Sequence, residues 1–408
     1  MKILLVSQYF YPEPFIINDL VKTLVSQGHE VVVYTGKPNY PEGKIYPGFS
    51  SNGFENDYFD DSVKVYRVPL RPRGKSGAKN LLLNYLSFVF SGIRFLNRIE
   101  DKDFDVIFAF GLSPITSVIP AIFYKWKTKK KLFLWVQDLW PESLVATGYV
   151  KNRVILSIVK LMVKWIYSCC DGILIQSKGF HKPISEYVKD SKISYYPNSI
   201  KIHENNTSIA LPEQINTLLD NYFCVVFAGN LGKAQSLDTV VDAAEKLSDL
   251  TDIKVVLVGS GSELEWLKNQ KDTRNLHNLE IVGRLPMESM PSVYNKSDAL
   301  LVTLTDNEII NLTIPSKIQS YLSAGKPIIA ALNGEGAKVI QDSKAGLISE
   351  AGNSMKLEEN IRYLYLLSEP ERDKMGKRGI KYFHQHFNME CQAKTLTEIL
   401  QENVGLYE

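Results

Sequence analysis

Two glycine-bearing turns in the second half of the chain have the residue types that bind phosphate groups. Ala228-Gly229-Asn230-Leu231-Gly232 follows an apolar run and precedes a helical pattern, and Val258-Gly259-Ser260-Gly261 repeats this arrangement one unit later. Glycine lets backbone N–H groups approach an anion, and a helix N-terminus adds a favourable potential. Neither turn is a complete GxGxxG motif, and a purely structural turn explains either one alone. Their pairing favours an anion site at Gly229, Asn230 and Gly259.

A lysine in the first turn of a predicted helix is a second candidate for contact with the same anion. Pro315, Ser316 and Lys317 open a helical pattern that ends at Ser323, and Gly325 follows it. Proline at the start and glycine at the end are ordinary for a helix. The helix dipole, however, favours negative charge near the start by about 0.3–1 kcal/mol. A phosphate between Lys317 and the helix N-terminus would resolve this conflict; a solvated lysine is the alternative.

In the first half of the chain, carboxylates stand beside aromatic residues just after predicted strands. Asp138 and Trp140 follow the strand expected at residues 131–136, and Glu13 and Phe15 follow the strand expected at residues 2–6. Carboxylates accept hydrogen bonds from hydroxyl groups, and aromatic faces pack on the apolar faces of sugars. Ligands of open α/β sheets bind at the carboxyl ends of the strands. We therefore favour sugar recognition over a simple turn at Asp138 and Trp140, whereas ordinary packing explains the aromatic residues around Glu13 and Phe15 equally well.

Alternating strands and helices must position these residues. Short apolar runs alternate with helical patterns up to about residue 198, become polar and irregular over 199–221, and then begin again at 223. This pattern predicts parallel sheets covered by helices on both faces. We expect an α/β fold of two doubly wound, Rossmann-like domains that face each other across a cleft. The expected boundaries are 1–198 for the N-terminal domain, 199–221 for a linker, 222–385 for the C-terminal domain and 386–408 for a final helix.

Composition excludes several other classes of protein. The 408 residues are 45% hydrophobic and 23% charged, which is ordinary for a globular protein. The four cysteines form no CxxC or Cys/His spacing, so we expect neither a zinc site nor a disulfide framework. The first ten residues read as a buried strand rather than as a signal peptide. These features predict a cytoplasmic protein.

The net charge of +2 conceals an asymmetry between the two halves. Residues 1–200 carry 26 basic and 17 acidic side chains, a net charge of +9, and the remainder carries 21 and 28, a net charge of −7. Two basic amphipathic segments lie in the first half, Leu81–Leu96 and Lys151–Trp165. They fit docking on an anionic membrane surface, and core helices with a solvated basic face explain them equally well. No nucleic-acid-binding motif is present, so we expect no nucleic-acid partner.

Several motifs resemble the bacterial glycosyltransferase family 4 enzymes, particularly the WbuB-like L-fucosamine transferases of surface-polysaccharide assembly. The resemblance covers nearly the whole chain. The motifs that carry it are Gln8–Pro14, Asn39–Gly48, Val136–Gly148, Pro197–Ser199, Ala228–Gln235, Thr313–Lys317 and Ala324–Pro327. It implies a GT-B fold, retaining and metal-independent transfer without a cofactor, a nucleotide-sugar donor held by the C-terminal domain, and a final helix that returns to the N-terminal domain.

The resemblance also implies a substrate class and site residues. Many relatives act at the cytoplasmic face of the inner membrane, as peripheral proteins, on undecaprenyl-diphosphate-linked glycans of O-antigen or capsule. The implied donor is a UDP-sugar, with an N-acetylated deoxyhexosamine such as FucNAc as the sugar. Implied donor-binding residues are Gly229, Asn230, Lys233, Gln235, Gly259, Arg284, Leu285, Pro315, Ser316 and Ser320. Implied catalytic residues are Asp138 and Lys317, and Glu13, Phe15 and Trp140 border the acceptor.

This sequence departs from the family at the donor site. Relatives often place two glutamates eight residues apart, where this chain has Leu312 and Ser320, and an arginine and a lysine where it has Asn230 and Gln235. Lys233, Arg284 and Lys317 are therefore the cations expected to bind a diphosphate. Two other functions remain open: an enzyme resembling UDP-HexNAc 2-epimerase, and a catalytically inactive subunit that binds nucleotide sugars.

Overall fold

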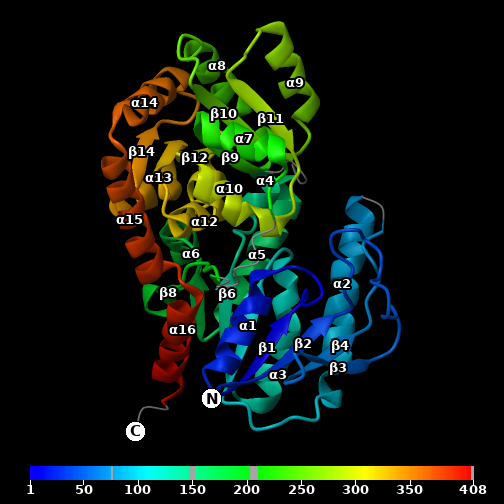
Figure 1. The fold of residues 1–408 in the computed structure, drawn as a ribbon. Helices are drawn as coiled ribbons and strands as arrows, with labels where there is room; N and C mark the ends of the chain where they lie inside the picture. Colours follow the sequence, from blue (N-terminus) through cyan, green and yellow to red (C-terminus); the bar gives the residue numbers. More distant parts are fainter. Residues whose placement is uncertain (75–76, 147–151, 203–209, 406–408) are drawn as a thin grey trace. The chain divides into compact units, whose positions relative to one another are not determined.

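The chain folds into two compact units, each built around its own sheet. The computed structural model describes residues 1–74, 77–146, 152–202 and 210–405 (Figure 1). The N-terminal unit comprises Met1–Lys201 together with Met389–Glu408, and the C-terminal unit comprises Ile202–Asn388.

The N-terminal unit contains an eight-stranded sheet in the order β3-β4-β2-β1-β5-β6-β7-β8. Its strands are β1 (Lys2–Ser7), β2 (Glu30–Gly36), β3 (Glu55–Phe59), β4 (Val63–Val68), β5 (Val106–Gly111), β6 (Lys131–Val136), β7 (Gly172–Ile175) and β8 (Ile193–Tyr195). Strand β3 pairs with β4 in the antiparallel sense, and the other pairs are parallel. The carboxyl ends of the parallel strands therefore lie at one edge of the sheet.

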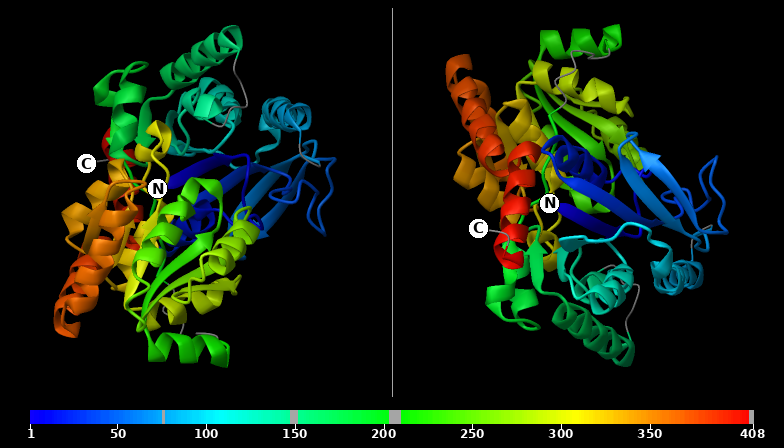
Figure 2. Two further views of the ribbon diagram at one scale, coloured as in Figure 1. Left: turned by 90° about the horizontal axis from the view of Figure 1, so that it is seen from above. Right: turned by 90° about the horizontal axis from the view of Figure 1, so that it is seen from below.

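Helices cover both faces of this sheet. They are α1 (Ile16–Ser26), α2 (Ala78–Arg94), α3 (Ile119–Thr128), α4 (Glu142–Ala146), α5 (Arg153–Cys169), α6 (His181–Ser185) and α16 (Met389–Val404). Helix α16 packs beside α1, and α3 contacts both α2 and α5. Figure 2 shows α2 and α5 on the side of the sheet away from α16.

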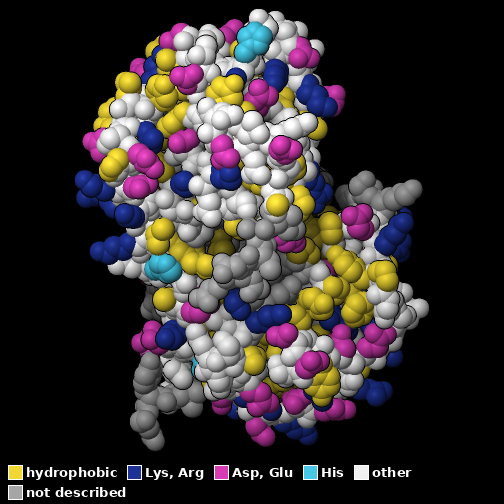
Figure 3. Space-filling model, in the orientation of Figure 1, with side chains coloured by type: hydrophobic (Ala, Val, Ile, Leu, Met, Phe, Trp, Pro, Cys, Tyr) yellow, Lys and Arg dark blue, Asp and Glu magenta, His cyan; other side chains and the backbone are white. Residues whose placement is uncertain are grey.

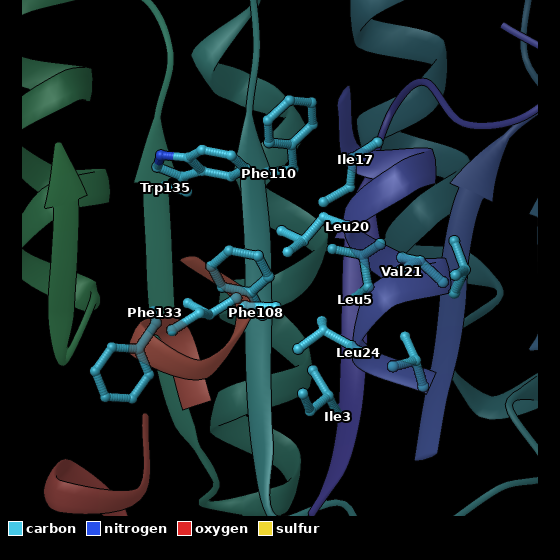
Figure 4. Packing of buried hydrophobic residues seen from close by; sticks show 14 of the residues in the cluster. Ile3, Leu5, Ile17, Leu20, Val21, Leu24, Phe108, Phe110, Phe133 and Trp135 are labelled. Carbon is cyan, nitrogen blue, oxygen red and sulfur yellow. The ribbon is translucent and has the colours of Figure 1, made fainter. Parts of the chain in front are cut away.

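The core of the N-terminal unit lies between the sheet and the α1/α16 layer. Ile3 and Leu5 of β1 meet Leu20 and Leu24 of α1, with Phe108 of β5 beside them (Figure 4). Strand β5 is buried along its whole length, which explains its unbroken apolar sequence. Apolar side chains of α16 belong to the same cluster, so the C-terminal helix completes this core. Full burial of one such side chain contributes about 1.5–3 kcal/mol.

The C-terminal unit contains a six-stranded parallel sheet in the order β11-β10-β9-β12-β13-β14. Its strands are β9 (Phe223–Asn230), β10 (Ile253–Ser260), β11 (Leu279–Gly283), β12 (Ala299–Thr303), β13 (Ile328–Ala331) and β14 (Gly346–Ser349). Its helices are α7 (Glu213–Asn221), α8 (Leu237–Lys246), α9 (Leu264–Thr273), α10 (Met290–Lys296), α11 (Glu308–Asn311), α12 (Ser316–Ala324), α13 (Gly334–Ser343), α14 (Ser354–Leu366) and α15 (Glu369–His386). The α/β class predicted from the sequence is confirmed in both units.

Several elements were not predicted from the sequence, among them helix α7, strands β3 and β14, and helices α13, α14 and α15. Helix α7 lies within 199–221, which was expected to be irregular; Glu213 in its first turn suits the helix dipole, and Leu219 is buried. Strand β3 was missed because its sequence, ENDYF, lacks an apolar run, as suits an edge strand. Strand β14 was also missed, because it is only four residues long.

One family motif and one basic segment extend beyond the residues that the structure describes. Residues 147–148 of the Val136–Gly148 motif, and Lys151 of the second basic segment, lie outside the described residues. Within the described ranges, every helix is too short or too polar to cross a bilayer.

Candidate functional site

Two adjacent glycines open the carboxyl edge of the C-terminal sheet. Gly229 of β9 pairs with Gly259 of β10, and their φ angles of +140° and +148° are ones that side chains strongly disfavour. A Cβ on Gly259 would lie 1.8 Å from the carbonyl oxygen of Gly229. Because only glycine fits at this contact, the strand ends stay bare and the backbone is accessible to a ligand.

A cavity of about 280 Å³ lies directly against these glycines. Its lining residues come from the ends of β9, β10 and β11 and from the start of α10: Gly229, Asn230, Val258, Gly259, Ser260, Arg284, Leu285, Met287 and Met290. The wall is mainly apolar, with one guanidinium from the exposed Arg284. Five sequence-predicted donor residues meet here, whereas Met287 and Met290 were missed because a methionine carries no specific signal for ligand binding.

Lys317 approaches the same strand end from α12. Its Nζ donates a hydrogen bond to Oε1 of Gln235 and lies 3.6 Å from the centroid of the Phe227 ring. Its stem passes so close to Gly229 that a Cβ there would lie 2.6 Å from Lys317 Cε. The structure thus brings Lys317 and Gly229, which the sequence suggested for one anion site, together with Gln235, which the family resemblance implied as a donor-binding residue.

The ammonium group of Lys317 is held without a neutralising carboxylate. No ion pair links Lys317 to an acidic side chain within the described ranges. Burial therefore lowers the pKa of Lys317 to about 7, because an uncompensated charge is disfavoured away from water. The nearby start of α12 lacks a side-chain cap, since Pro315 is its N-cap residue. This arrangement concentrates unmet positive potential beside the cavity.

The turn that carries Gln235 is fixed by the end of β12. Thr303 Oγ1 donates to the carbonyl oxygen of Gln235, and Thr305 N donates to that of Ala234 at 3.0 Å. Sequence analysis missed Thr303, because it lies 68 residues from its partner. These bonds determine where the amide of Gln235 can meet Lys317.

The other predicted donor residues lie around this centre with fewer contacts. Ser316 is exposed and Ser320 is half-buried one turn later, where its hydroxyl donates to the Ser316 carbonyl oxygen at 3.3 Å. Lys233 is exposed and is absent from the cavity lining. Among the described residues, no cluster of three histidine, cysteine or acidic side chains is positioned to hold a metal ion.

In the N-terminal unit, Ser113 joins Asp138 to Trp140. The backbone N–H of Ser113 donates to Asp138 Oδ2 at 3.1 Å, and Trp140 Nε1 donates to Ser113 Oγ at 3.0 Å. Ser113 follows β5 and Asp138 follows β6, so two adjacent strand ends are connected. Asp138 is half-buried, and among the described residues its Oδ1 has no hydrogen-bond donor, so it can accept a further hydrogen bond. Sequence analysis did not identify Ser113.

Glu13 connects the loops that follow β1 and β2. Its carboxylate is fully buried and accepts hydrogen bonds from the backbone N–H groups of Phe10 at 3.1 Å, Asn39 at 2.8 Å and Tyr40 at 2.7 Å. Burial raises the pKa of Glu13 to about 7, although the three donors oppose this shift. Glu13 therefore shapes the two loops through their backbones.

Aromatic side chains from these two loops pack against one another. Phe15 stacks on Tyr9 with ring centroids 5.4 Å apart and lies 5.2 Å from Tyr40. The guanidinium of Arg73 lies 5.2 Å from the Tyr40 ring centroid. Phe15 and Tyr40 are half-buried, so part of each ring faces solvent. Tyr40 and Arg73 are additions that the sequence did not single out as site residues.

Both halves of the chain match known protein families. Residues 16–199 match the glycosyl transferase 4-like domain, and residues 211–382 match the glycosyl transferases group 1. The Escherichia coli (strain K12) protein WcaI, assigned to colanic acid biosynthesis as a glycosyl transferase, is 24% identical over 339 residues, covering 80% of this chain and 82% of that protein.

Solved structures with the same fold cover almost the entire chain. Sucrose-phosphate synthase from Thermosynechococcus elongatus has a TM-score of 0.73 and 16% identity, covering 99% of each chain. Anabaena Alr3699/HepE in complex with UDP has a TM-score of 0.68 and 14% identity, covering 98% of this chain and 100% of that one. An Escherichia coli trehalose-6-phosphate structure bound with UDP-2-fluoro glucose has a TM-score of 0.72 and 11% identity, covering 98% and 99%. These likenesses confirm the predicted GT-B fold.

Proposed function

The N-terminal half of this chain belongs to the glycosyl transferase 4-like domains and its C-terminal half to the group 1 glycosyl transferases, and we propose that the chain transfers a sugar from a UDP-sugar to a lipid-linked glycan. The observation that carries this proposal is the convergence of Lys317, Gln235 and Gly229 beside a cavity at the strand ends. The apolar cavity suits the nucleoside of a nucleotide sugar, and the neighbouring Lys317 and strand-end backbone suit its diphosphate.

The diphosphate is proposed to lie between Lys317 and the backbone of Gly229 and Asn230. Lys317 has a lowered pKa and no carboxylate partner among the described residues, so a dianionic ligand would restore its protonated state. The uncapped start of α12 adds N–H donors at Ser316 and Lys317. As the glycosidic bond breaks, negative charge builds on the leaving diphosphate, and these groups stabilise that charge.

The nucleoside is proposed to occupy the cavity beside Gly259. Its apolar walls suit a planar base, and Arg284 and Leu285 border the same space. The Alr3699/HepE structure holds UDP and the Escherichia coli trehalose-6-phosphate structure holds UDP-2-fluoro glucose, and this supports uracil as the base. Ser320 stands where many relatives have a glutamate, and we propose that its hydroxyl contributes a weaker polar contact to the donor.

The acceptor is proposed to bind at the strand ends of the N-terminal unit. Asp138 Oδ1 can accept a hydrogen bond from a sugar hydroxyl, and Trp140 is held near Asp138 because both residues hydrogen-bond to Ser113. The Phe15 and Tyr40 rings, held by the loops that Glu13 joins, offer faces on which a sugar can pack. We propose that Asp138 orients the attacking hydroxyl.

The likeness to a protein of colanic acid biosynthesis supports a role in surface-polysaccharide assembly, such as O-antigen or capsule. We propose a peripheral location on the cytoplasmic face of the inner membrane, where lipid-linked intermediates are presented. We further propose an N-acetylated deoxyhexosamine such as FucNAc as the transferred sugar, with retention of configuration and without a metal ion.

A nucleotide screen followed by a turnover assay tests this function. UDP and UDP-sugars should raise the melting temperature of the full chain more than GDP or ADP, because a ligand that binds only the folded state stabilises it. UDP should then be released only when a lipid-linked acceptor is added. A new sugar formed from UDP-HexNAc without acceptor would instead indicate an epimerase, and UDP binding without turnover on any acceptor would indicate an inactive subunit.

A further inference from the structure

Three neighbouring helices of the N-terminal unit carry basic charge without any acidic residue. Helices α2, α3 and α5 contain 17, 10 and 17 residues, and none is aspartate or glutamate. Their basic residues are Lys79, Arg94, Lys125, Lys127, Arg153, Lys160 and Lys164. Among the described residues, acidic side chains from elsewhere pair with two of them: Asp171 with Lys125 at 2.6 Å, and Glu186 with Lys160 at 3.7 Å. The layer therefore remains electropositive.

Helix α5 is apolar on two opposite sides. Val163, Ile166 and Tyr167 are buried against the unit. The other side carries Val154, Ile158, Leu161 and Trp165, which are 68%, 61%, 68% and 38% exposed. At about 100° per residue, these four positions form one stripe roughly opposite the buried side, with Arg153, Lys160 and Lys164 along its flank. The core explains only one of the two apolar sides.

Helices α2 and α3 also carry exposed apolar side chains. Leu82, Leu86 and Phe90 of α2 are 56%, 39% and 70% exposed, and they follow one another at four-residue intervals between Lys79 and Arg94. Figure 3 shows hydrophobic side chains gathered around α2.

Trp126 of α3 is 45% exposed, and its ring lies 6.2 Å from that of Trp165, so it joins α3 to α5. Single exposed apolar residues are common on proteins, but two sets, on α2 and α5, with Trp126 on the helix α3 that contacts both, mark an interaction surface.

We propose that the outward side of α2, α3 and α5 docks on an anionic lipid bilayer. This docking face consists of Leu82, Leu86, Phe90, Trp126, Val154, Ile158, Leu161 and Trp165, flanked by the basic residues above. Its apolar ridges enter the headgroup region, its tryptophans lie at the interface, and its lysines and arginines meet anionic lipids.

The charges favour a membrane over a protein partner. Lysine is depleted at the centre of protein–protein interfaces, whereas here two lysines lie along the flank of the exposed apolar stripe of α5. The inference rests on the proposed function in one respect: a lipid-linked acceptor would bring the enzyme to a bilayer. Docking on this face would keep the acceptor-binding unit at the surface from which its substrate comes.

The test is flotation of the full chain with vesicles. Vesicles of phosphatidylcholine containing about 30% phosphatidylglycerol should carry the protein, and vesicles of phosphatidylcholine alone should carry at least about tenfold less. Raising the salt to about 0.5 M should weaken the binding, because exposed charges are then screened. Failure to float with anionic vesicles at low salt would overturn the proposal.

Matched variants locate the docking face. L161E should reduce flotation about tenfold or more, because it places a charge in the apolar ridge, and L366E, which changes an 80% exposed leucine on α14, should not. K160E/K164E should also reduce flotation, whereas K377E/K381E, with the same spacing on α15, should leave it unchanged. Equal flotation of each variant and its control would contradict the assignment.

Two further readouts separate the possible failures. Light scattering should show the same molar mass for wild type and L161E; a wild-type dimer that L161E dissociates would reassign the face to self-association. The melting-temperature shift with UDP, measured without vesicles, should be the same for wild type and L161E. Flotation without a UDP shift would leave docking intact and refute the proposed donor, and a UDP shift without flotation would do the reverse.

Discussion

Gly259 lies directly beside Gly229 in the β9–β10 pair, so close that a Cβ on Gly259 would be 1.8 Å from the Gly229 carbonyl oxygen. This contact keeps two strand ends free of side chains at the position where the cavity and Lys317 meet. The same residues therefore determine both local stability and access to the proposed diphosphate site.

G259A should destabilise the protein by roughly 2–5 kcal/mol, because it combines a disfavoured φ angle with a backbone clash. G352A is the matched control: Gly352 also has a positive φ of +80°, but a Cβ there has no neighbour within 4 Å. It should cost only about 1–2 kcal/mol. Urea unfolding monitored by fluorescence measures both; equal losses would show that the close contact has little energetic weight.

K317M should make the protein more stable while weakening UDP binding. The pKa of Lys317 is lowered to about 7, below its unfolded value, so the folded state disfavours its charged form. The penalty is fully present below pH 7 and is relieved as pH rises from 7 towards 10. Replacing the ammonium with a thioether should raise the unfolding free energy by about 1–2 kcal/mol near neutral pH.

The stability of K317M should also lose part of its pH dependence between pH 7 and 10. Unfolding of wild type and K317M at a series of pH values gives this comparison, with K377M on α15 as the control for an exposed lysine. If K317M were less stable than wild type, Lys317 would stabilise the unliganded fold, which would contradict the prediction.

Glu13 should impose the opposite pH dependence in an acidic window. Its folded pKa is raised to about 7 from an ordinary value of 4.5, so the folded state binds more protons between these values. Stability contributed by protonated Glu13 should therefore fall as pH rises from about 4.5 to 7. E13Q should remove this dependence and cost about 1–3 kcal/mol, because its amide group presents a donor to a backbone N–H. Urea unfolding from pH 5 to 8 tests this, and the exposed Glu42, as E42Q, should leave the pH profile unchanged.

D138N should lower the rate of sugar transfer by about 10²–10⁴-fold if Asp138 acts as a base, and less if it only orients the acceptor. The amide oxygen can still accept from Ser113 N–H, so folding should be retained. UDP affinity, measured by calorimetry, should not change, because Asp138 belongs to the N-terminal unit. Weakened UDP binding would place Asp138 at the donor instead, and D190N, at an exposed aspartate, provides the control.

The sequence predicted those features that depend on local pattern. Buried parallel strands such as β5 have unbroken apolar runs, and the glycines at 229 and 259 are needed by the local backbone. The contact between Lys317 and Gln235 joins residues 82 positions apart, and sequence could propose but not establish it. The role of Ser113 in holding both Asp138 and Trp140 depends on the order of strands in the sheet, which no local signal carries.

The same limit applies to the basic amphipathic segments. Their periodicity alone left core packing and membrane docking equally plausible, since any packed helix shows an apolar stripe. Only the structure shows that Ile158 and Leu161 face away from the buried side of α5. Conversely, α7 escaped prediction because its polar sequence offers a single strongly buried residue, Leu219.

The most direct test of the central claim is calorimetric titration of wild type, K317A and K377A with UDP and with uridine at pH 7. If Lys317 and the Gly229 backbone bind the diphosphate, wild type and K377A should bind UDP far more tightly than uridine. K317A should bind uridine as wild type does and lose at least about tenfold in UDP affinity, which corresponds to about 1.4 kcal/mol. UDP binding by K317A at wild-type affinity, or wild-type binding of UDP no tighter than uridine, would contradict the account.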